Sequence, residues 1–468
     1  MSWIQTAYLI AEIISIPLTG FLTRVLTMRW LFVIAVSVFT LASIACAAST
    51  GFTSLIVARV VQGFAGGTLI PAVFAAVFLL FPVQQQALAT TIAGVLAVLA
   101  PTVGPVVGGW LTETYSWHWL FLINVAPGVI AATVAGATLA REPPALEKAR
   151  QLDWISLALM AIALAALEIA IKEAPERGWT SLQVAGLLML SFTAGAAFVI
   201  RALRSANPLV DVRTLAARNF ATGCALSFAL GIGLFGSVYL MPVFLAYVRG
   251  HGALDIGKIM LVTGVAQLAS APIAVYLDQR YDERVLSALG ILAFGIGLGM
   301  SCAETTGSDF DQMFWPQVVR GCATMFCILP PTRLAMALLS KAQIPDASGL
   351  FNMMRNLGGA IGIAVIDTII YSRSPIHSKQ LLDRLASGDL DLAKSLGIPL
   401  DALANPAVVG EFVKKAAFVE AINDAWAVTA VVVLAALACI PLARVTSTTG
   451  LAFAIDKGSV EMRRVRTP

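Results

Sequence analysis

Long apolar runs separated by short polar stretches dominate this chain. An α-helix needs about 20 mostly apolar residues to cross the hydrocarbon core of a bilayer, and on that criterion the sequence predicts about thirteen spans. Their approximate ranges are 4–22, 30–49, 53–81, 87–111, 119–140, 153–171, 180–200, 219–248, 255–277, 285–303, 313–339, 346–371 and 425–443. Gly and Pro interrupt several runs, which bilayer helices tolerate when neighbours satisfy the freed backbone groups. The predicted fold class is therefore an all-α membrane protein.

The composition agrees with a membrane protein and gives no sign of an enzyme. Hydrophobic residues make up 58% of the 468 residues and charged residues only 12%, whereas a soluble domain carries about 25% charged residues. The net charge of +4 gives no reason to expect a nucleic-acid partner. Six cysteines without a CxxC pair and three histidines predict no metal or redox site. No nucleophile–base set or phosphate loop is present, so we expect neither catalysis nor a cofactor.

The Lys and Arg residues predict the orientation, because they are enriched in cytoplasmic loops. They gather in alternate loops and after residue 443, which predicts a cytoplasmic C-terminal tail and a multi-pass protein of the cytoplasmic (inner) membrane. On the opposite side, the long segment 372–424 carries charges of both signs, and we expect it to form a small water-exposed subdomain. Thirteen spans would place Met1 outside, so we expect one further span upstream of it.

Arginines occur inside three of the predicted spans. Arg59 and Gln62 lie about one turn apart and share a helix face. A second copy of the pattern, Gln317–Gly321, contains Arg320, and Arg355 lies in a glycine-rich span. An unpaired charge inside a span costs at least about 2.5–3.5 kcal/mol on insertion scales, so each arginine must face a cavity or a partner. A structural role as a clamp on helix ends is the alternative for Arg320 and Arg355.

Three acidic residues inside spans are candidates for proton coupling. They are Glu12, Glu168 and Asp367. A carboxyl group in apolar surroundings and one beside an arginine differ in proton affinity. A group that moves between the two environments can therefore load and release a proton. A fixed ion pair or polar packing is the alternative for Glu12 and Asp367, and contact with water at the end of its span is the alternative for Glu168.

One predicted span is rich in small and helix-bending residues. Pro101, Gly104, Pro105, Gly108 and Gly109 follow one another within it. Small residues let two helix backbones approach closely, and each proline removes a backbone donor and bends the helix. Such a helix could act as a pivot or a seal at a helix interface. Ordinary packing of small residues is the alternative.

These motifs resemble the major facilitator superfamily and, more narrowly, its fourteen-span drug:proton antiporter family of the EmrB/QacA type. The segment 99–109 resembles the superfamily's antiporter motif, and Ala58–Gly63 resembles its RxxQG motif. The stretches 207–213 and 217–220 resemble the connector into the family's C-terminal lobe, and Ser348–Gly362 resembles its penultimate span.

The resemblance implies a fold of two six-helix lobes with a two-helix insertion between them. The N-terminal lobe would be 1–140, with five spans because the family's first span is missing, and 141–218 would hold the inserted hairpin and connectors. The C-terminal lobe would be 219–443, including an extracytoplasmic loop at 372–424, followed by a cytoplasmic tail at 444–468. The family's missing span usually carries an acidic residue implicated in transport.

The resemblance also implies two gate loops on the cytoplasmic side. The first loop lacks the aspartate of the family's GxxxD-type motif, and the second, at 272–284, is expected to act as an equivalent latch. The residues that resemble gate positions are Gly20, Arg24, Arg29, Asp278, Arg280 and Arg284.

The function expected from these features is proton-coupled efflux of drugs or other amphipathic small molecules. The alternative is export of one endogenous metabolite, such as a siderophore or lipid precursor, because the same motifs serve both. A receptor or scaffold without turnover is a third hypothesis, and the charges inside spans argue against it. Expected partners are the small-molecule substrate, membrane lipid and, by resemblance to Gram-negative relatives, a periplasmic adaptor and an outer-membrane channel.

Overall fold

The regular elements of the described chain are all helices. The structure is a computed structural model that describes residues 3–205, 208–399 and 405–444. A few side chains within helices, including those of Pro101 and Pro105, also lie outside the described part. Within these limits no strand is present, and the predicted all-α class is confirmed.

The first group of helices packs around α3. Its members are α1 (Trp3–Ser15), η1 (Ile16–Leu18), α2 (Thr19–Ala47), α3 (Phe52–Leu80), α4 (Val83–Thr114), α5 (Trp119–Leu122) and α6 (Val125–Thr138). Helices α1 and α2 pack along α3, and α6 packs against α2. Thr27 has a positive φ of 65°, so the long helical run from Trp3 to Ala47 is broken into two rods there.

A helical hairpin follows, flanked by two short 3-10 turns. It consists of α7 (Trp154–Arg177) and α8 (Leu182–Arg204), between η2 (Leu146–Gln151) and η3 (Val212–Ala216). Side-chain oxygens cap both helices, since Asp153 accepts from the backbone at the start of α7 and Ser181 does so for α8. Leu182 and Phe192 on α8 are 91% and 77% exposed, which suits contact with lipid.

The last group of helices contains the largest apolar core. Its members are α9 (Arg218–Phe244) with the π-helical turn η4 (Leu245–Arg249), α10 (Ala253–Asp278), α11 (Glu283–Gly299), η5 (Met300–Ala303), α12 (Phe310–Met336), α13 (Ile344–Ala386), α14 (Leu390–Ser395), α15 (Pro406–Ala435) and η7 (Ala436–Leu442). Buried Leu240, Phe244, Ile291 and Phe294 lie at its centre. It meets the first group where α10 packs on α4 and where α13 packs on α2 and α3.

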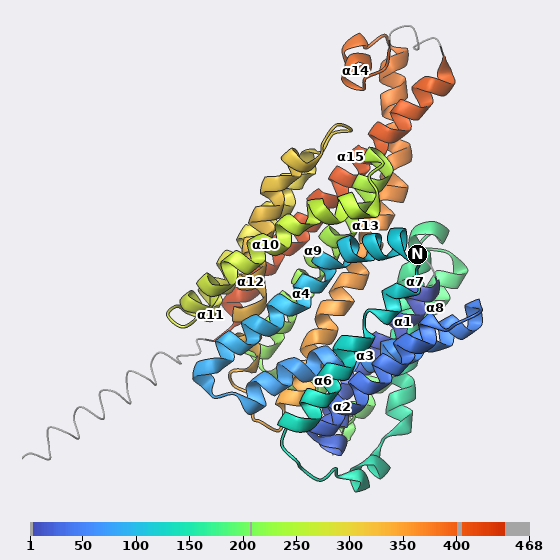
Figure 1. The fold of residues 1–468 in the computed structure, drawn as a ribbon. Coiled ribbons are helices and arrows are strands. Elements are labelled where there is room, and N and C mark those ends of the chain that lie inside the picture. The colour runs from blue at the N-terminus through green and yellow to red at the C-terminus, as the bar shows by residue number, and fades with distance from the viewer. Residues whose placement is uncertain (1–2, 206–207, 400–404, 445–468) are drawn as a thin grey trace, which may run out of the picture.

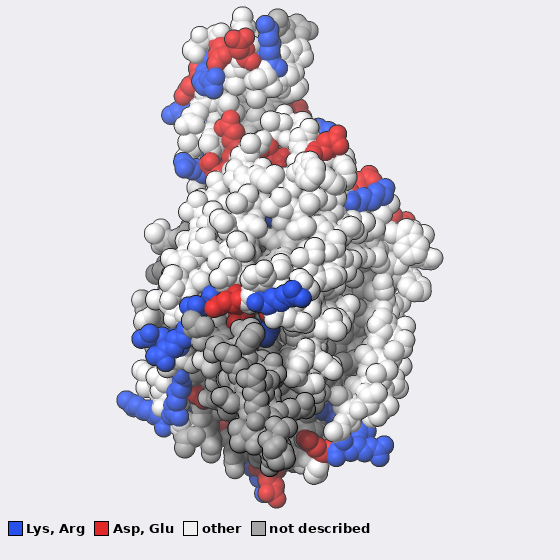
Figure 2. Space-filling model, turned by 90° about the vertical axis from the view of Figure 1, so that its left-hand side faces the viewer, with Lys and Arg blue, Asp and Glu red and all other residues white. Residues whose placement is uncertain are grey.

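The membrane-spanning prediction agrees with the observed helices. Ten helices in the described part are long and apolar enough to cross a membrane. One of them, Trp3–Ala47, is the run broken at Thr27, and the long helices α4 and α12 lie beside the others. Each predicted span therefore has a helix at its position. In Figure 2 a belt with almost no Lys, Arg, Asp or Glu separates the charged protrusion from the charged residues of the lower half of the view.

A helical protrusion stands out at one end of the molecule, which we call the protruding end (Figure 1). It comprises the last part of α13, α14 and the first part of α15, and it has a small core of its own that includes Leu381, Leu392 and Val413. The sequence predicted that the flanking spans end at 371 and begin at 425. Both helices instead continue through the protrusion, because these apolar side chains pair the two helices outside the belt.

Candidate functional site

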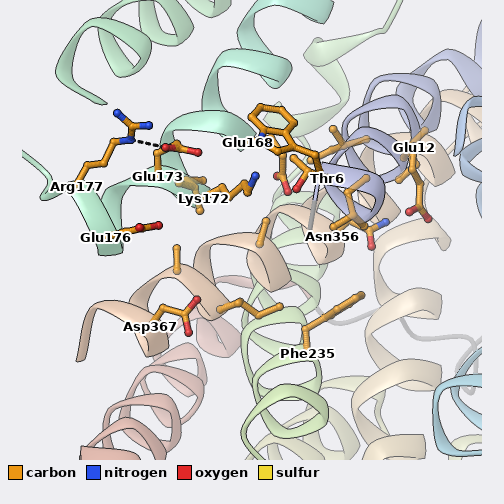
Figure 3. A pocket seen from close by; sticks show the side chains of 18 residues that line it. Thr6, Glu12, Glu168, Lys172, Glu173, Glu176, Arg177, Phe235, Asn356 and Asp367 are labelled. Atoms are coloured by element: carbon orange, nitrogen blue, oxygen red, sulfur yellow. Dashed lines mark hydrogen bonds and ion pairs between the residues drawn. The ribbon is translucent and has the colours of Figure 1, made fainter. Parts of the chain in front are cut away.

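A cavity of about 330 Å³ lies among α1, α7, α9 and α13. Its size falls at the lower end of the range of small-molecule sites, about 300–1,000 Å³. The wall is mixed, because apolar side chains such as Phe235 alternate with charged and amide groups (Figure 3). Its polar lining residues include Thr6, Glu12, Glu168, Lys172, Asn356 and Asp367. We call this space the acidic cavity.

The structure brings the three predicted acids together in the acidic cavity. Glu12 comes from α1, Glu168 from α7 and Asp367 from α13, three segments far apart in sequence, and α7 adds Glu173 and Glu176 to the lining (Figure 3). All three side chains are only partly buried. Among the described ion pairs, none includes any of these three carboxyl groups. They are therefore available to a proton or to a cationic ligand.

Arg59 lies beside this cavity and ties α1 to α3. Its guanidinium donates to the Gln62 Oε1 at 2.6 Å and to the Ile4 carbonyl at 3.4 Å, and it stacks 4.2 Å from the centre of the Tyr8 ring. Tyr8 precedes Glu12 by one helical turn and shares its face. The positive charge is thus held one turn from the Glu12 carboxyl without forming an ion pair with it.

Asp367 has a different setting from the other two acids. The Tyr239 hydroxyl of α9 donates to its Oδ1 at 2.6 Å. Thr368, the residue that follows Asp367 in α13, accepts a hydrogen bond from the Trp179 indole at 3.0 Å. This bond attaches the turn between α7 and α8 to α13. Lys172 lies over the Trp3 ring at 3.9 Å rather than in an ion pair with a cavity acid. The α7–α8 hairpin therefore forms one wall of the cavity.

The other two predicted intramembrane arginines lie outside the acidic cavity. Arg320 is 3% exposed, approaches the Ser301 hydroxyl at 3.4 Å and lies 4.7 Å from the centre of the Trp426 ring. Arg355 lies near the rings of Phe74 and Phe351, and its Nε and Nη2 have no hydrogen-bond partner among the described residues. Neither forms an ion pair within the described part, and Arg320 lines two small cavities.

Of the predicted gate residues in the described part, Arg24 and Gly20 contact the other group of helices. Arg24 forms an ion pair with Asp346 of α13, a residue that sequence reasoning did not single out. Gly20 lies directly against Asp346, where a side chain at residue 20 would overlap the carboxyl group. Two residues further along α13, the Ser348 hydroxyl donates to the Pro71 carbonyl of α3 at 2.7 Å. We call this end of the molecule the Arg24 end.

The remaining gate residues make contacts within their own group of helices. Arg29 donates to the Gly136 carbonyl at 2.5 Å. Asp278 pairs with Arg333 of α12 rather than with another loop residue. The other two are Arg284, which pairs with Asp282 at 3.1 Å, and Arg280, which lies over the Tyr276 ring at 4.2 Å. Their role as gate latches stays a prediction.

The small-residue helix α4 packs closely against α10. A side chain at Gly109 would meet the backbone of Ala253 and Leu254, and one at Gly257 would overlap Val106. Gly108 faces Leu120, whereas Gly104 has open space beside it. The side chains of Pro101 and Pro105 lie outside the described residues. Close α4–α10 packing fits the seal or pivot that the sequence suggested, and that role stays a prediction.

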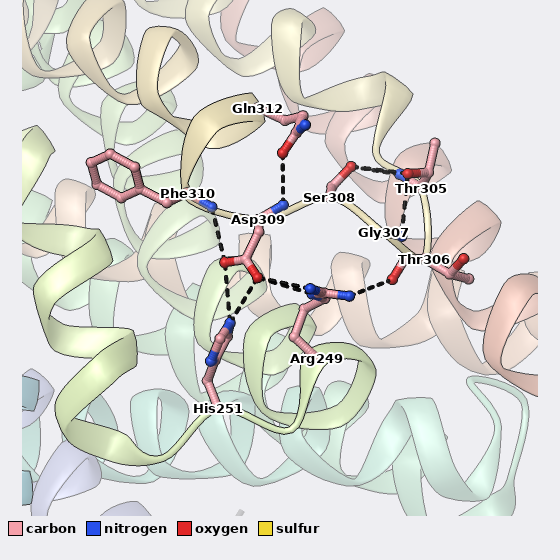
Figure 4. A network of polar contacts seen from close by, with 9 residues as sticks. All are labelled: Arg249, His251, Thr305, Thr306, Gly307, Ser308, Asp309, Phe310 and Gln312. Atoms are coloured by element: carbon pink, nitrogen blue, oxygen red, sulfur yellow. Dashed lines mark hydrogen bonds and ion pairs between the residues drawn. The ribbon is translucent and has the colours of Figure 1, made fainter.

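A polar network fixes the loop that enters α10 at the protruding end (Figure 4). Arg249 donates to the Asp309 carboxylate at 2.9 Å, and the His251 Nε2 lies 3.1 Å from both of its oxygens. Burial raises the pKa of Asp309, but its hydrogen bonds with Arg249 and His251 outweigh burial and hold that pKa below its usual range. The carboxylate is therefore ionised and anchors the loop.

Several residues of the site escaped the sequence analysis. Asp346 follows a proline at the start of a span, and an acid in an apolar segment was a signal that would have found it. Asn356 is uncharged, so its sequence carries no such signal. Among the described residues, no group of three or more His, Cys, Asp or Glu could hold a metal ion.

The comparisons with known proteins agree with these features. The model of the family "Major Facilitator Superfamily" matches residues 1–363. This chain belongs to the major facilitator superfamily. Within the superfamily, the chain is 38% identical to the colistin resistance protein EmrB of Acinetobacter baumannii, with 81% of this chain and 75% of the relative covered. It is 29% identical to the multidrug export protein EmrB of Escherichia coli K12, covering 82% and 75%.

A solved structure supports the major facilitator fold as well. The crystal structure of the human organic anion transporter MFSD10 aligns with a TM-score of 0.56 at 14% identity, covering 92% of this chain and 83% of that one. At that identity the likeness concerns the fold alone. The predicted resemblance to EmrB-type proteins is confirmed, and the chain is a multi-pass membrane protein of a transporter family.

Proposed function

We propose that this major facilitator protein exports amphipathic small molecules in exchange for protons. The observation that carries the proposal is the acidic cavity, in which Glu12, Glu168 and Asp367 gather from three helices without an ion pair among the described residues. Intramembrane carboxyl groups are costly unless they serve a pathway. The EmrB relatives named for colistin resistance and multidrug export support the same function.

Exchange follows from competition for the same carboxyl groups. A proton neutralises a cavity acid, whereas a cationic substrate is attracted to the ionised form, so the two compete. Arg59, held one turn from Glu12, favours ionisation of that carboxyl group when no other ligand is present. Because a ligand shifts a conformational equilibrium only through its different affinity for the two states, proton binding and substrate binding favour opposite states.

The ion pair at the Arg24 end is the proposed latch of one of these states. Arg24–Asp346 and Ser348–Pro71 join α13 to α2 and α3 at one end of the acidic cavity. Opening this end breaks a partly buried ion pair and a hydrogen bond, and rocking of the two helix groups about the cavity would expose it to the other side. From the Lys and Arg distribution we propose that the Arg24 end is cytoplasmic.

Purified protein in liposomes provides the test. A pH gradient should drive uptake of the fluorescent cation ethidium by the unchanged protein. Glu12→Gln and Asp367→Asn should each abolish the gradient-dependent part while leaving protein yield intact. The matched control is Glu142→Gln, since Glu142 is exposed and lies outside the cavity. Gradient-driven uptake that survives both cavity substitutions would contradict proton coupling at these acids.

The protrusion is the proposed contact surface for a periplasmic adaptor that leads to an outer-membrane channel. It extends beyond the apolar belt and has an apolar core of its own, which gives it a fixed shape. Replacing residues 388–404 by a short Gly/Ser linker should leave ethidium binding unchanged and abolish co-purification of an adaptor. Co-purification that persists would place the contact on another surface.

A further inference from the structure

Lys172 brings a positive charge into the acidic cavity without an ion-pair partner among the described residues. In the described part, two basic side chains line this cavity, those of Lys172 and Arg177. Arg177 pairs with Glu173 of the same helix at 2.5 Å. Lys172 takes part in none of the described ion pairs, although it lies among carboxyl groups. Another contact must therefore hold its ammonium group.

The Lys172 ammonium lies against an aromatic ring of another helix. Its Nζ is 3.9 Å from the centre of the Trp3 ring, at the start of α1. In Figure 3 the Lys172 side chain extends from α7 toward α1. Indole is the aromatic ring that attracts cations most strongly, and Trp3 lines the acidic cavity as well. The protein's own lysine thus covers a cation-binding ring of the cavity.

Two carboxyl groups of α7 offer other places for the same ammonium group. Glu168 lies four residues before Lys172 and Glu176 four residues after it, so the three side chains share one helix face. Glutamate and lysine at this spacing can pair, and the flexible four-carbon stem of lysine lets the ammonium group move. Glu176 is exposed. A shift of the ammonium toward Glu176 would therefore free the Trp3 ring without leaving the charge unpaired.

The contact between Lys172 and Trp3 lies at the end of the cavity away from the Arg24 end. Trp3 begins α1, and the chain runs from there past Ile16, which also lines the cavity, to Arg24 in α2. A substrate that enters from the Arg24 end therefore reaches Lys172 last. The lysine is placed where it can act on release of the substrate.

An organic cation can replace the ammonium group over the Trp3 ring. A lysine ammonium is strongly hydrated, so it gains from returning to water. Quaternary ammonium ligands, in contrast, are recognised by aromatic rings in many binding sites. Glu168, in the same cavity, attracts either cation. Lys172 and a cationic ligand would therefore compete for one place.

We propose that Trp3 and Glu168 bind the cationic group of the substrate, a quaternary or delocalised organic cation, and that Lys172 is a tethered competitor for this place. The proposal rests on the proposed function, because only a cationic substrate competes with a lysine. Substrate binding displaces the ammonium group toward Glu176. Its return to the ring favours release of the substrate at the end of the cavity away from Arg24.

Binding of ethidium to the purified protein tests the competition. Ethidium is a permanent aromatic cation, so its charge does not depend on pH. Lys172→Met keeps an apolar stem and removes the charge. It should tighten ethidium binding roughly two- to fivefold, which corresponds to about 0.5–1 kcal/mol for one cation–π contact. In a Trp3→Leu background the same substitution should leave the affinity nearly unchanged. Lys379→Met, at an exposed lysine in the last part of α13, is the matched control.

The two backgrounds separate competition at the ring from a general effect of charge. Equal tightening with Trp3 and with Leu at residue 3 would show that Lys172 acts through its charge at a distance. Unchanged affinity of Lys172→Met would show that it does not compete. Either result would overturn the tethered competitor and leave proton-coupled efflux standing. If the unchanged protein binds no ethidium, the cationic substrate class and the tethered competitor fail together.

The chemical reactivity of Lys172 gives a second measurement, which needs no substitution. A brief treatment with a water-soluble acetylating ester, read by mass spectrometry, reports how accessible each lysine is. Bound ethidium should increase acetylation of Lys172, because the displaced ammonium group moves toward exposed Glu176, and should leave Lys379 unchanged. Acetylation of Lys172 that stays equal or falls would mean that the lysine remains over Trp3, and displacement would be wrong.

Discussion

Two regions of this protein hold acids with opposite pairing. At the Arg24 end, Asp346 pairs with Arg24 and Asp278 pairs with Arg333, both across helices. In the acidic cavity, Glu12, Glu168 and Asp367 have no ion-pair partner in the described part, although Arg59 is near Glu12. Glu173 also lines this cavity and pairs with Arg177. The difference is not one of burial alone, because Asp346 and Asp278 are the more buried acids.

Whether a carboxyl group has an arginine partner determines how readily it can exchange a proton or bind a cation. A guanidinium partner favours the ionised form of a carboxylate, and the resulting ion pair stabilises one arrangement of helices. An acid without a partner can bind a proton, a cation or water, and its state follows the surroundings. We therefore infer that the Arg24 end holds a conformation and that the acidic cavity responds to ligands.

The largest effect should come from giving a cavity acid a permanent partner. Asn356 lines the acidic cavity with Glu12 and Asp367, so Asn356→Arg places a guanidinium among the carboxyl groups. A carboxyl group paired in this way remains ionised, and we expect gradient-driven ethidium uptake in liposomes to fall by at least about a hundredfold, equivalent to roughly 2.7 kcal/mol. Asn356→Gln is the control. Uptake that survives Asn356→Arg would mean that unpaired acids are not required.

Breaking the latch should have an intermediate effect. Removing one partner of a fully buried ion pair costs about 3–5 kcal/mol, but the Arg24 side chain is 34% exposed, so we expect about 1–2 kcal/mol from Arg24→Ala or Asp346→Asn. Thermal unfolding of the two single variants and the double variant forms a double-mutant cycle. Additive losses would show that the two side chains do not interact.

The same latch variants should also change access to the cavity. Loss of the ion pair favours opening of the Arg24 end, so a cysteine introduced at Ile16, which lines the acidic cavity, should react faster with a water-soluble maleimide. Arg29→Ala is the control, because Arg29 bonds within its own helix group. An equal increase in the labelling rate for Arg29→Ala would show that the faster labelling reflects a general loosening of the protein and not the loss of the Arg24–Asp346 ion pair.

The two regions also differed in how far the sequence could predict them. Glu12, Glu168 and Asp367 interrupt apolar runs, and a charge in a span is visible in any hydropathy pattern. The Arg24–Asp346 pair joins residues 322 positions apart, and only the packing of α2 against α13 brings them together.

The boundaries of the protrusion show a similar limit of prediction from the sequence. The sequence predicted that the spans end at 371 and restart at 425, because charged residues appear there. Hydropathy measures suitability for lipid rather than helicity, and it cannot distinguish a helix that leaves the membrane from a loop. The continuation of α13 to Ala386 depends on tertiary contacts with α15 around Leu381 and Val413.

The smallest effect is expected at a paired acid outside the membrane belt. Asp153 caps α7 and accepts hydrogen bonds from Arg201 at 2.7 and 3.0 Å, and these bonds hold the pKa of Asp153 below its usual range. A lowered carboxyl pKa contributes stability above the ordinary Asp value of about 3.9, and that stability is lost only as the pH falls toward the lowered pKa.

Asp153→Asn therefore separates a paired acid from the cavity acids by its pH response. Asparagine keeps the helix cap, so only the ion pair is lost, and the thermal midpoint should fall slightly and by the same amount at pH 5 and at pH 8. A midpoint difference that disappears at pH 5 would mean that Asp153 takes up a proton in this interval. In that case pairing with arginine would not keep acids of this protein ionised, and the division between latch and cavity would lose its physical basis.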